Sequence, residues 1–187
     1  MVEYDWGGLL ARWGSELAVS EQASPWNQMP ELIASGWPYH PTASEDEIGM
    51  VEARLGLSLP PSYRGFLKVS NGWPVMGNPF SGGLRPVEEI ERFAVRNQAW
   101  LDVIRRMPDD PNTEYVYPVG AETFEAAIEI SHAAEGILLL NPAVVDGEGE
   151  MEAWLFEAEM GIKRYRSFWE MMQTEYQIFC YLEVRSP

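Results

Sequence analysis

The chain has 187 residues, of which 46% are hydrophobic, and it carries a net charge of −16 and a single cysteine, Cys180. This length and apolar content predict a folded globular protein and exclude a disordered chain, while the acidic charge disfavours direct binding to nucleic acid. The lone cysteine, the acidic start without an apolar leader and the lack of any run of ~20 apolar residues predict a cytoplasmic protein without a membrane span.

The N-terminal segment is predicted to begin with a helix within residues 3–21, because bulky apolar side chains recur there at helical spacing. Prolines interrupt regular structure over residues 24–41, a stretch that also contains Trp26 and Trp37. The apolar positions of this first helix are Leu9, Leu10, Trp13 and Leu17.

A capping box marks the start of the next helix. Ser44 can accept a hydrogen bond from the helix amides, and Glu47 can reach back to the backbone of Ser44. Gly56 is predicted to end this helix. A second helix follows from Pro61 to about Ser70, with Asn71-Gly72 as its stop signal. The apolar positions of the two helices are Ile48, Val51, Leu55, Tyr63, Phe66 and Leu67.

The middle of the chain is predicted to form a Gly- and Pro-rich loop over residues 73–86 and then a long third helix over residues 87–107. Trp73, Met76 and Phe80 lie in the loop. Their side chains suit either lids over the core or anchors for a partner.

The C-terminal half changes to strand-like patterns followed by one helix, so the sequence predicts an α+β fold. We expect N-terminal helices to pack on a largely antiparallel sheet of four to six strands, with a C-terminal helix capped by Ser167 and Glu170 and ending near Tyr176. The strand-like segments are residues 115–119, 126–131, 136–141 and 152–156.

The stretch from Ile48 to Gly72 resembles the signature of the SUKH superfamily. Looser similarities follow at Tyr117–Gly120, at the apolar run from Ile137 and at Arg166–Trp169. The residues that carry the resemblance in the first stretch are Glu52, Leu55, Gly56, Leu59, Pro60, Tyr63, Phe66, Leu67, Asn71 and Gly72.

The resemblance implies one domain over residues 1–187, made of an N-terminal extension (1–43) and a core (44–187). It also implies a protein that acts by binding, since bacterial members of the superfamily are immunity proteins against toxins and fungal relatives regulate cell-wall synthesis. Two departures are the long, Trp-rich N-terminal segment and a partly helical pattern over residues 121–130, where the family has a loop and a strand.

The search for catalytic chemistry finds few candidates, and the sequence predicts no enzyme, cofactor or metal site. His40 and His132 belong to no metal-ligand spacing, and no nucleophile elbow or phosphate loop is present. A pair of Cys180 with His132 remains open on composition, although the aromatic neighbours of Cys180 favour a buried, inert thiol.

Charge is spread unevenly, and residues 107–162 hold thirteen acidic residues and no basic one. Such a segment favours a basic protein partner, for example a nuclease-type toxin domain, and simple solubility is the alternative explanation. Alternating acids at 146–152 also suit Ca²⁺, but without the layout of an EF-hand. The predicted partner-binding residues are Trp73, Phe80, Asp109, Asp110, Glu114, Asp146, Glu148, Glu150 and Glu152.

The functional hypothesis is an immunity protein that neutralises one cognate toxin domain by direct binding. A regulatory scaffold without a toxin remains a second hypothesis, and a binder of a peptide or small ligand on the concave face of the sheet a third. The oligomeric state is left open.

Overall fold

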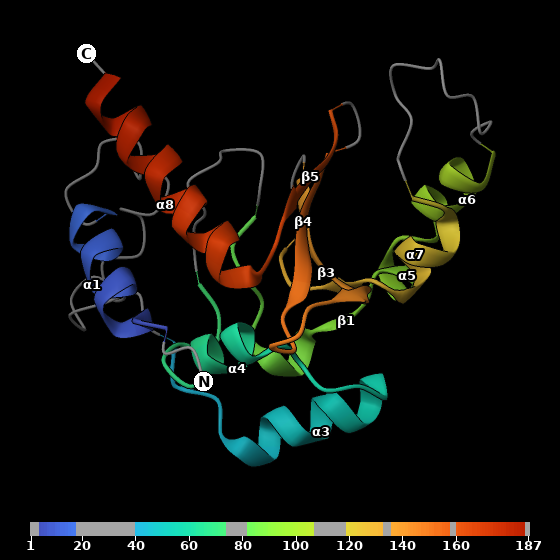
Figure 1. Cartoon of the computed structure of the whole chain (residues 1–187), viewed down its shortest axis with the longest axis horizontal. Coiled ribbons are helices and arrows are strands. Elements are labelled where there is room, and N and C mark those ends of the chain that lie inside the picture. The colour runs from blue at the N-terminus through green and yellow to red at the C-terminus, as the bar shows by residue number, and fades with distance from the viewer. Residues whose placement is uncertain are drawn as a thin grey trace.

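The computed structural model describes residues 4–17, 40–73, 82–106, 119–132, 136–157 and 160–185. Within these ranges the chain forms an α+β fold, as the sequence predicts, with helices on both sides of one sheet (Figure 1). The helical elements are α1 (Trp6–Leu17), α3 (Glu45–Leu55), α4 (Pro61–Leu67), η1 (Val87–Glu89), α5 (Phe93–Arg96), α6 (Gln98–Arg106), α7 (Ala121–Ala126) and α8 (Phe168–Arg185).

The sheet has five antiparallel strands in the order of the sequence. The β3–β4 hairpin forms its centre, with Leu139 opposite Trp154, and β5 extends it so that Ala153 lies opposite Tyr165. The strands are β1 (Glu91–Arg92), β2 (Ile128–Glu129), β3 (Gly136–Val145), β4 (Met151–Glu157) and β5 (Gly161–Tyr165).

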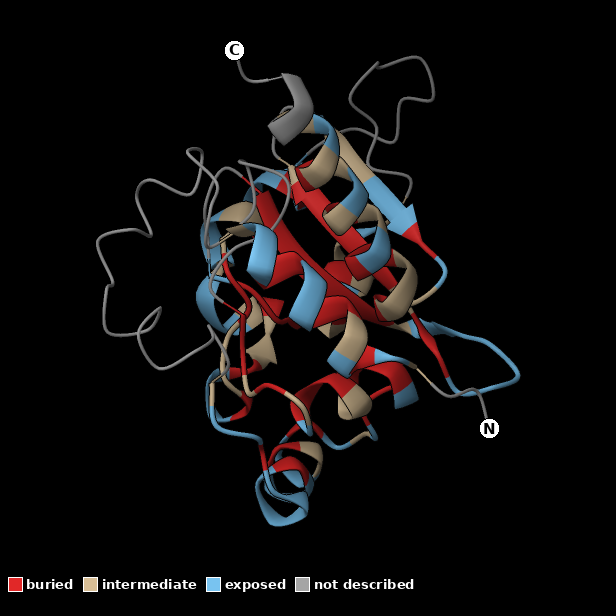
Figure 2. Ribbon diagram, turned by 90° about the vertical axis from the view of Figure 1, so that its left-hand side faces the viewer, coloured by how far each residue is buried: buried red, intermediate tan, exposed pale blue. Residues whose placement is uncertain are grey.

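Over residues 136–141 of β3 and most of β4, side chains are buried on both faces of the sheet, to which successive residues of a strand point in turn. Leu138 and Leu140 join a large core with residues of α1, α3, α4 and α8. Ile137 and Leu139 join a smaller core with residues of α5, α6 and α7. Figure 2 shows the central strands buried behind helices whose outer surfaces are exposed. Helices therefore pack on both faces of the central hairpin.

Helix α1 is part of the main core, although it comes from the segment that the sequence marks as an extension. Trp6 is 2% exposed, and its ring centroid lies 5.4 Å from those of Phe66 and Phe168. Gly65 of α4 allows this approach, since a Cβ atom there would lie 3.2 Å from the indole nitrogen of Trp6. Trp13 is fully buried beside Trp73.

The local signals of α3 are confirmed by the structure. Ser44 and Glu47 form the reciprocal hydrogen bonds of a capping box, and Gly56 ends the helix with a φ of 70°. Helix α4 ends at Leu67, three residues before the predicted end at Ser70. The Asn71-Gly72 pair, predicted as the stop signal, therefore lies beyond the end of the helix. The side-chain oxygen of Asn71 accepts a hydrogen bond from the backbone of Val87, which fixes the start of η1.

The prediction of one long helix over residues 87–107 is wrong, because this segment forms η1, β1, α5 and α6. Ile90 packs in the main core, whereas Phe93 packs in the smaller core on the other face of the sheet. One continuous helix could not reach both. Arg54 holds the extended backbone between them by donating to the carbonyl of Ile90 (2.5 Å).

The remaining strand predictions hold in part. Strands β3 and β4 contain the predicted segments 136–141 and 152–156, and β2 covers only Ile128–Glu129 of 126–131, after the short helix α7. Strand β5 and the extension of α8 to Arg185 were not predicted. The predicted strand at 115–119 lies outside the described residues apart from Val119, which is not in a strand.

We expect Trp6→Ala to lower the free energy of unfolding by about 3–5 kcal/mol, because it removes a buried ring that joins α1 to α4 and α8. Denaturant unfolding followed by circular dichroism measures the loss. Met50, which is 65% exposed on α3, is the control, and Met50→Ala should change stability by less than about 0.5 kcal/mol. Equal effects of the two changes would show that α1 is not part of the core.

Candidate functional site

The turn between β3 and β4 is acidic and held in one conformation. Asp146 accepts hydrogen bonds from the amides of Glu148 (2.8 Å) and Glu150 (2.9 Å) through a single carboxylate oxygen. Gly149 has a φ of 87°, a conformation that favours glycine. Asp146 and Glu148 are both exposed. The turn therefore presents two carboxylates to solvent from a defined backbone.

Glu150 points the other way, into the protein, where it is 3% exposed. Its carboxylate accepts hydrogen bonds from the Tyr4 hydroxyl (2.8 Å), the Ser62 amide (2.7 Å) and the Ser62 hydroxyl (2.5 Å). Because Pro60 at the N-cap of α4 offers no capping side chain, Glu150 supplies the acceptor and the negative charge that favour a helix N-terminus. Glu150 also lines the cleft beside this turn, so its contact with a partner stays a prediction, while its hydrogen bonds are made inside the fold.

A cleft of about 610 Å³ lies between this turn and α8. The cleft is lined by Asp146 and Glu148 of the turn and by the aromatic side chains of Tyr4 and Trp169. Polar side chains of α8 complete the lining. Burial and the Glu150 carboxylate raise the pKa of the Tyr4 hydroxyl above its ordinary value, which is already well above neutral pH. The other lining side chains that decide the charge and polarity of the cleft are Arg166, Glu170, Gln173 and Gln177.

The start of α8 contributes one internal ion pair to this cleft. Ser167 caps the helix by accepting from the amide of Glu170 (3.2 Å), as predicted, but the Glu170 carboxylate accepts from the amide of Arg166 (2.7 Å) and not from that of Ser167. The guanidinium of Arg166 also binds Glu170, which lowers the pKa of that carboxyl. Since these two charges offset each other, the negative charge of the cleft comes from the turn.

Glu152 lies on β4, and both oxygens of its carboxylate accept hydrogen bonds within the sheet. Arg164 of β5 donates two hydrogen bonds to its carboxylate (2.6 and 2.8 Å), and Trp154 and Asn141 donate one each. Glu152 therefore joins positions on three strands, and its contact with a partner stays a prediction.

The aromatic candidate Trp73 is fully buried in the main core, so it acts as a lid over the core and not as an exposed anchor. Of the predicted contact residues, the structure brings together Asp146, Glu148 and Glu150 at the cleft, where Glu150 is buried and the other two are exposed. The predicted contacts Phe80, Asp109, Asp110 and Glu114 lie outside the described residues, as do Met76, Trp26 and Trp37.

Residues 42–174 match the SMI1 / KNR4 family (SUKH-1), which is well over half of the chain. The chain belongs to this family. A search of curated proteins finds no significant match. The SUKH-1 match covers α3, α4, the sheet and the first turns of α8, and it leaves out Tyr4 and α1. Because the family includes immunity proteins and regulators, membership supports a protein that acts by binding.

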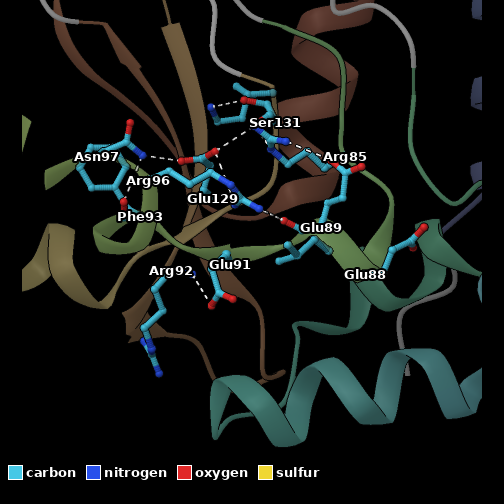
Figure 3. Close-up of polar contacts among 12 residues, drawn as sticks. Arg85, Glu88, Glu89, Glu91, Arg92, Phe93, Arg96, Asn97, Glu129 and Ser131 are labelled. Atoms are coloured by element: carbon cyan, nitrogen blue, oxygen red, sulfur yellow. Dashed lines mark hydrogen bonds and ion pairs between the residues drawn. The ribbon is translucent and has the colours of Figure 1, made fainter.

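A second polar cluster lies between β2 and α5, on the far side of the sheet from the cleft's helix. Figure 3 shows Arg85, Arg96 and Asn97 converging on Glu129, which is 1% exposed. The two arginines lie 3.3 and 3.8 Å from the Glu129 carboxylate, and Asn97 donates to it. Buried charges need such partners, so this cluster holds β2 and α5 together. The sequence signal for this cluster is an acid between two isoleucines, Ile128 and Ile130.

Burial shifts the pKa values of the cysteine and of both histidines from their ordinary values. Burial raises the pKa of the Cys180 thiol, and Glu16, to which the thiol donates (3.3 Å), raises it further. Burial lowers the pKa of both histidines, and Arg85 adds to this effect at His132. Within the described part of the chain, no three His, Cys, Asp or Glu residues gather closely enough to hold a metal ion. No described helix has the length and apolar content to cross a membrane.

We expect Glu150→Gln to destabilise the protein by about 1–3 kcal/mol, because the amide group cannot accept the Ser62 and Tyr4 hydrogen bonds at both of its ends. Glu148→Gln, two residues away on the exposed turn, is the matched control and should stay within about 0.5 kcal/mol of the unchanged chain. Urea unfolding of the three proteins measures both values. If Glu150→Gln were as mild as Glu148→Gln, Glu150 would not hold the turn in place.

Stability should depend on pH through Glu152. Burial raises the pKa of this carboxyl, but hydrogen bonds from Arg164, Trp154 and Asn141 outweigh burial and leave the pKa below its ordinary value. A carboxyl whose pKa is lower in the folded state stabilises the fold above about pH 4 and loses this contribution as pH falls through the folded-state pKa. The stability difference between the unchanged chain and Glu152→Gln should therefore shrink between pH 6 and pH 3. A difference that stays constant over this range would contradict the assignment.

Proposed function

We propose that this SUKH-1 protein is an immunity protein that neutralises a cognate toxin domain by direct, non-catalytic binding. The observation that carries the proposal is the rigid turn with Asp146 and Glu148 at the mouth of an open cleft. A surface of this kind suits a partner that reads charge in a fixed geometry. An interface of ordinary size would bury about 800 Å² on this protein.

A basic partner fits the charge of the chain best. Of the described acids that line the cleft, Glu150 and Glu170 are used in contacts within the protein. Asp146 and Glu148 remain, and neither forms an ion pair with a described residue. A nuclease domain is one such partner, because its own surface must attract nucleic acid phosphates. The acidic turn would then take the place of phosphate charge. The proposal places this encounter in the cytoplasm.

The proposal is tested by a pull-down from the native host, washed first at low and then at high salt and read by mass spectrometry. We expect one basic toxin domain, whose activity the purified chain then inhibits at a 1:1 ratio. Recovery of other proteins without a toxin, under conditions where the toxin is expressed, would overturn immunity in favour of a regulatory scaffold.

Charge steering gives a separate prediction for the recovered complex. Glu148→Gln should slow association by about threefold at low ionic strength, and the difference should fade at high salt, because exposed charges mainly affect association rates. Glu122, an exposed acid on α7, is the control, and Glu122→Gln should change the rate little. Surface plasmon resonance across a salt series measures these rates. Rates that respond to neither salt nor Glu148→Gln would exclude steering by the turn.

A further inference from the structure

The cleft beside the acidic turn has an aromatic pair as well as carboxylates. The ring centroids of Tyr4 and Trp169 lie 5.5 Å apart, and both residues line the cleft. Trp169 is held from behind by Trp6, whose ring meets it edge to face at 4.6 Å. Tyr4 is held by its hydrogen bond to Glu150. Both aromatic side chains are therefore fixed before any partner arrives.

Aromatic rings next to carboxylates form a favourable environment for an organic cation. The faces of tryptophan and tyrosine attract a guanidinium or ammonium group, and a carboxylate within reach adds charge-assisted hydrogen bonds. An anion would be repelled by Asp146 and Glu148, and a purely apolar group would leave them without partners. Among the described residues that line the cleft, the one basic side chain, Arg166, is already bound to Glu170 through its guanidinium (3.2 and 3.3 Å).

We propose that the cleft receives a basic side chain of the partner protein, arginine above all, between the Tyr4–Trp169 pair and the carboxylates of Asp146 and Glu148. Arginine fits better than lysine because its planar guanidinium stacks on a ring and donates to a carboxylate at the same time. The inference rests on the proposed function only in taking the occupant to be part of a protein.

Tyr4 becomes a specificity-determining residue in this arrangement. It lies outside residues 42–174, which match the SUKH-1 family, and yet it lines the cleft together with the turn and α8. The segment before the matched region therefore adds a contact surface to the shared scaffold. Its ring should contribute to cation binding, while its hydroxyl should matter mainly through Glu150.

The test uses the full chain and two blocked tripeptides, acetyl-Gly-Arg-Gly-amide and the same peptide with citrulline, which keeps the shape of arginine without its charge. Two-dimensional NMR of the ¹⁵N-labelled chain follows the Trp169 indole and the backbone amides of residues 146–149. We expect the arginine peptide to shift these signals in a saturable way. The citrulline peptide should bind at least roughly fivefold more weakly.

Single changes then assign the contacts. Glu148→Gln and Tyr4→Ala should each weaken binding of the arginine peptide by roughly two- to fivefold, and Tyr4→Phe, which keeps the ring, should weaken it less than Tyr4→Ala. Glu122→Gln, which removes an exposed charge from α7, should leave it unchanged. Because Glu148 is exposed and its change leaves the core intact, this variant keeps the test valid even if a Tyr4 variant unfolds.

The outcomes separate this inference from the proposed function. Equal responses to the two peptides, or shifts located away from the cleft, would overturn the arginine site. A toxin that binds tightly while the arginine peptide leaves the cleft signals unmoved would also overturn it and leave immunity standing. Specific arginine binding without any toxin in the pull-down would support the site and count against immunity.

Discussion

The buried carboxylate of Glu150 is the interaction on which the geometry of the cleft depends. It joins three segments that are far apart in the chain, since Tyr4 is 146 residues away and Ser62 is 88 residues away. A buried charge is expensive unless hydrogen bonds replace its water, and here two hydroxyls and a helix amide do so. Every movement of the turn relative to α4 or Tyr4 would break at least one of these bonds. The cleft is therefore built before binding, which lowers the entropic cost of holding a partner.

The location of the site follows from how the sheet is covered. Helices bury both faces of β3 and β4, so these faces are used for stability. The polar ends of the strands are then left as surfaces that can bind a partner. At β2 the buried carboxylate of Glu129 is bound by Arg85, Arg96 and Asn97 (Figure 3), so its charge is used within the fold. At the β3–β4 turn, Asp146 and Glu148 keep their charge exposed beside an open cleft.

Sequence reasoning succeeded where the signal was local. The Ser44–Glu47 capping box and the stop at Gly56 involve residues only a few positions apart. The continuous apolar run of β3 is enough to predict a buried strand. It failed where partners are distant. The acids at 146, 148, 150 and 152 looked equivalent along the chain, because nothing nearby reveals that Glu150 faces Ser62 of α4.

Distant contacts also explain why the prediction of one helix after Pro86 was wrong. Ile90 and Phe93 fit a helical period, but they belong to cores on opposite faces of the sheet, and only tertiary contacts such as Arg54 to Ile90 fix the break. Strand β5 was missed because Lys163 and Arg164 are exposed and polar there, at an edge that needs only one neighbouring strand. The acidic charge of the candidate site could be predicted from the sequence. Its aromatic part could not, because only the folded structure shows that Tyr4 lies next to Trp169.

The central claim is that the partner binds in the cleft between the turn and α8. Hydrogen–deuterium exchange of the chain, alone and with the toxin domain recovered from the native host, tests it most directly. We expect slower exchange at residues 146–149 and 166–177 in the complex, with α5, α6 and α7 unchanged. Protection confined to α5, α6 and α7, with the turn and α8 exchanging as in the free chain, would contradict it.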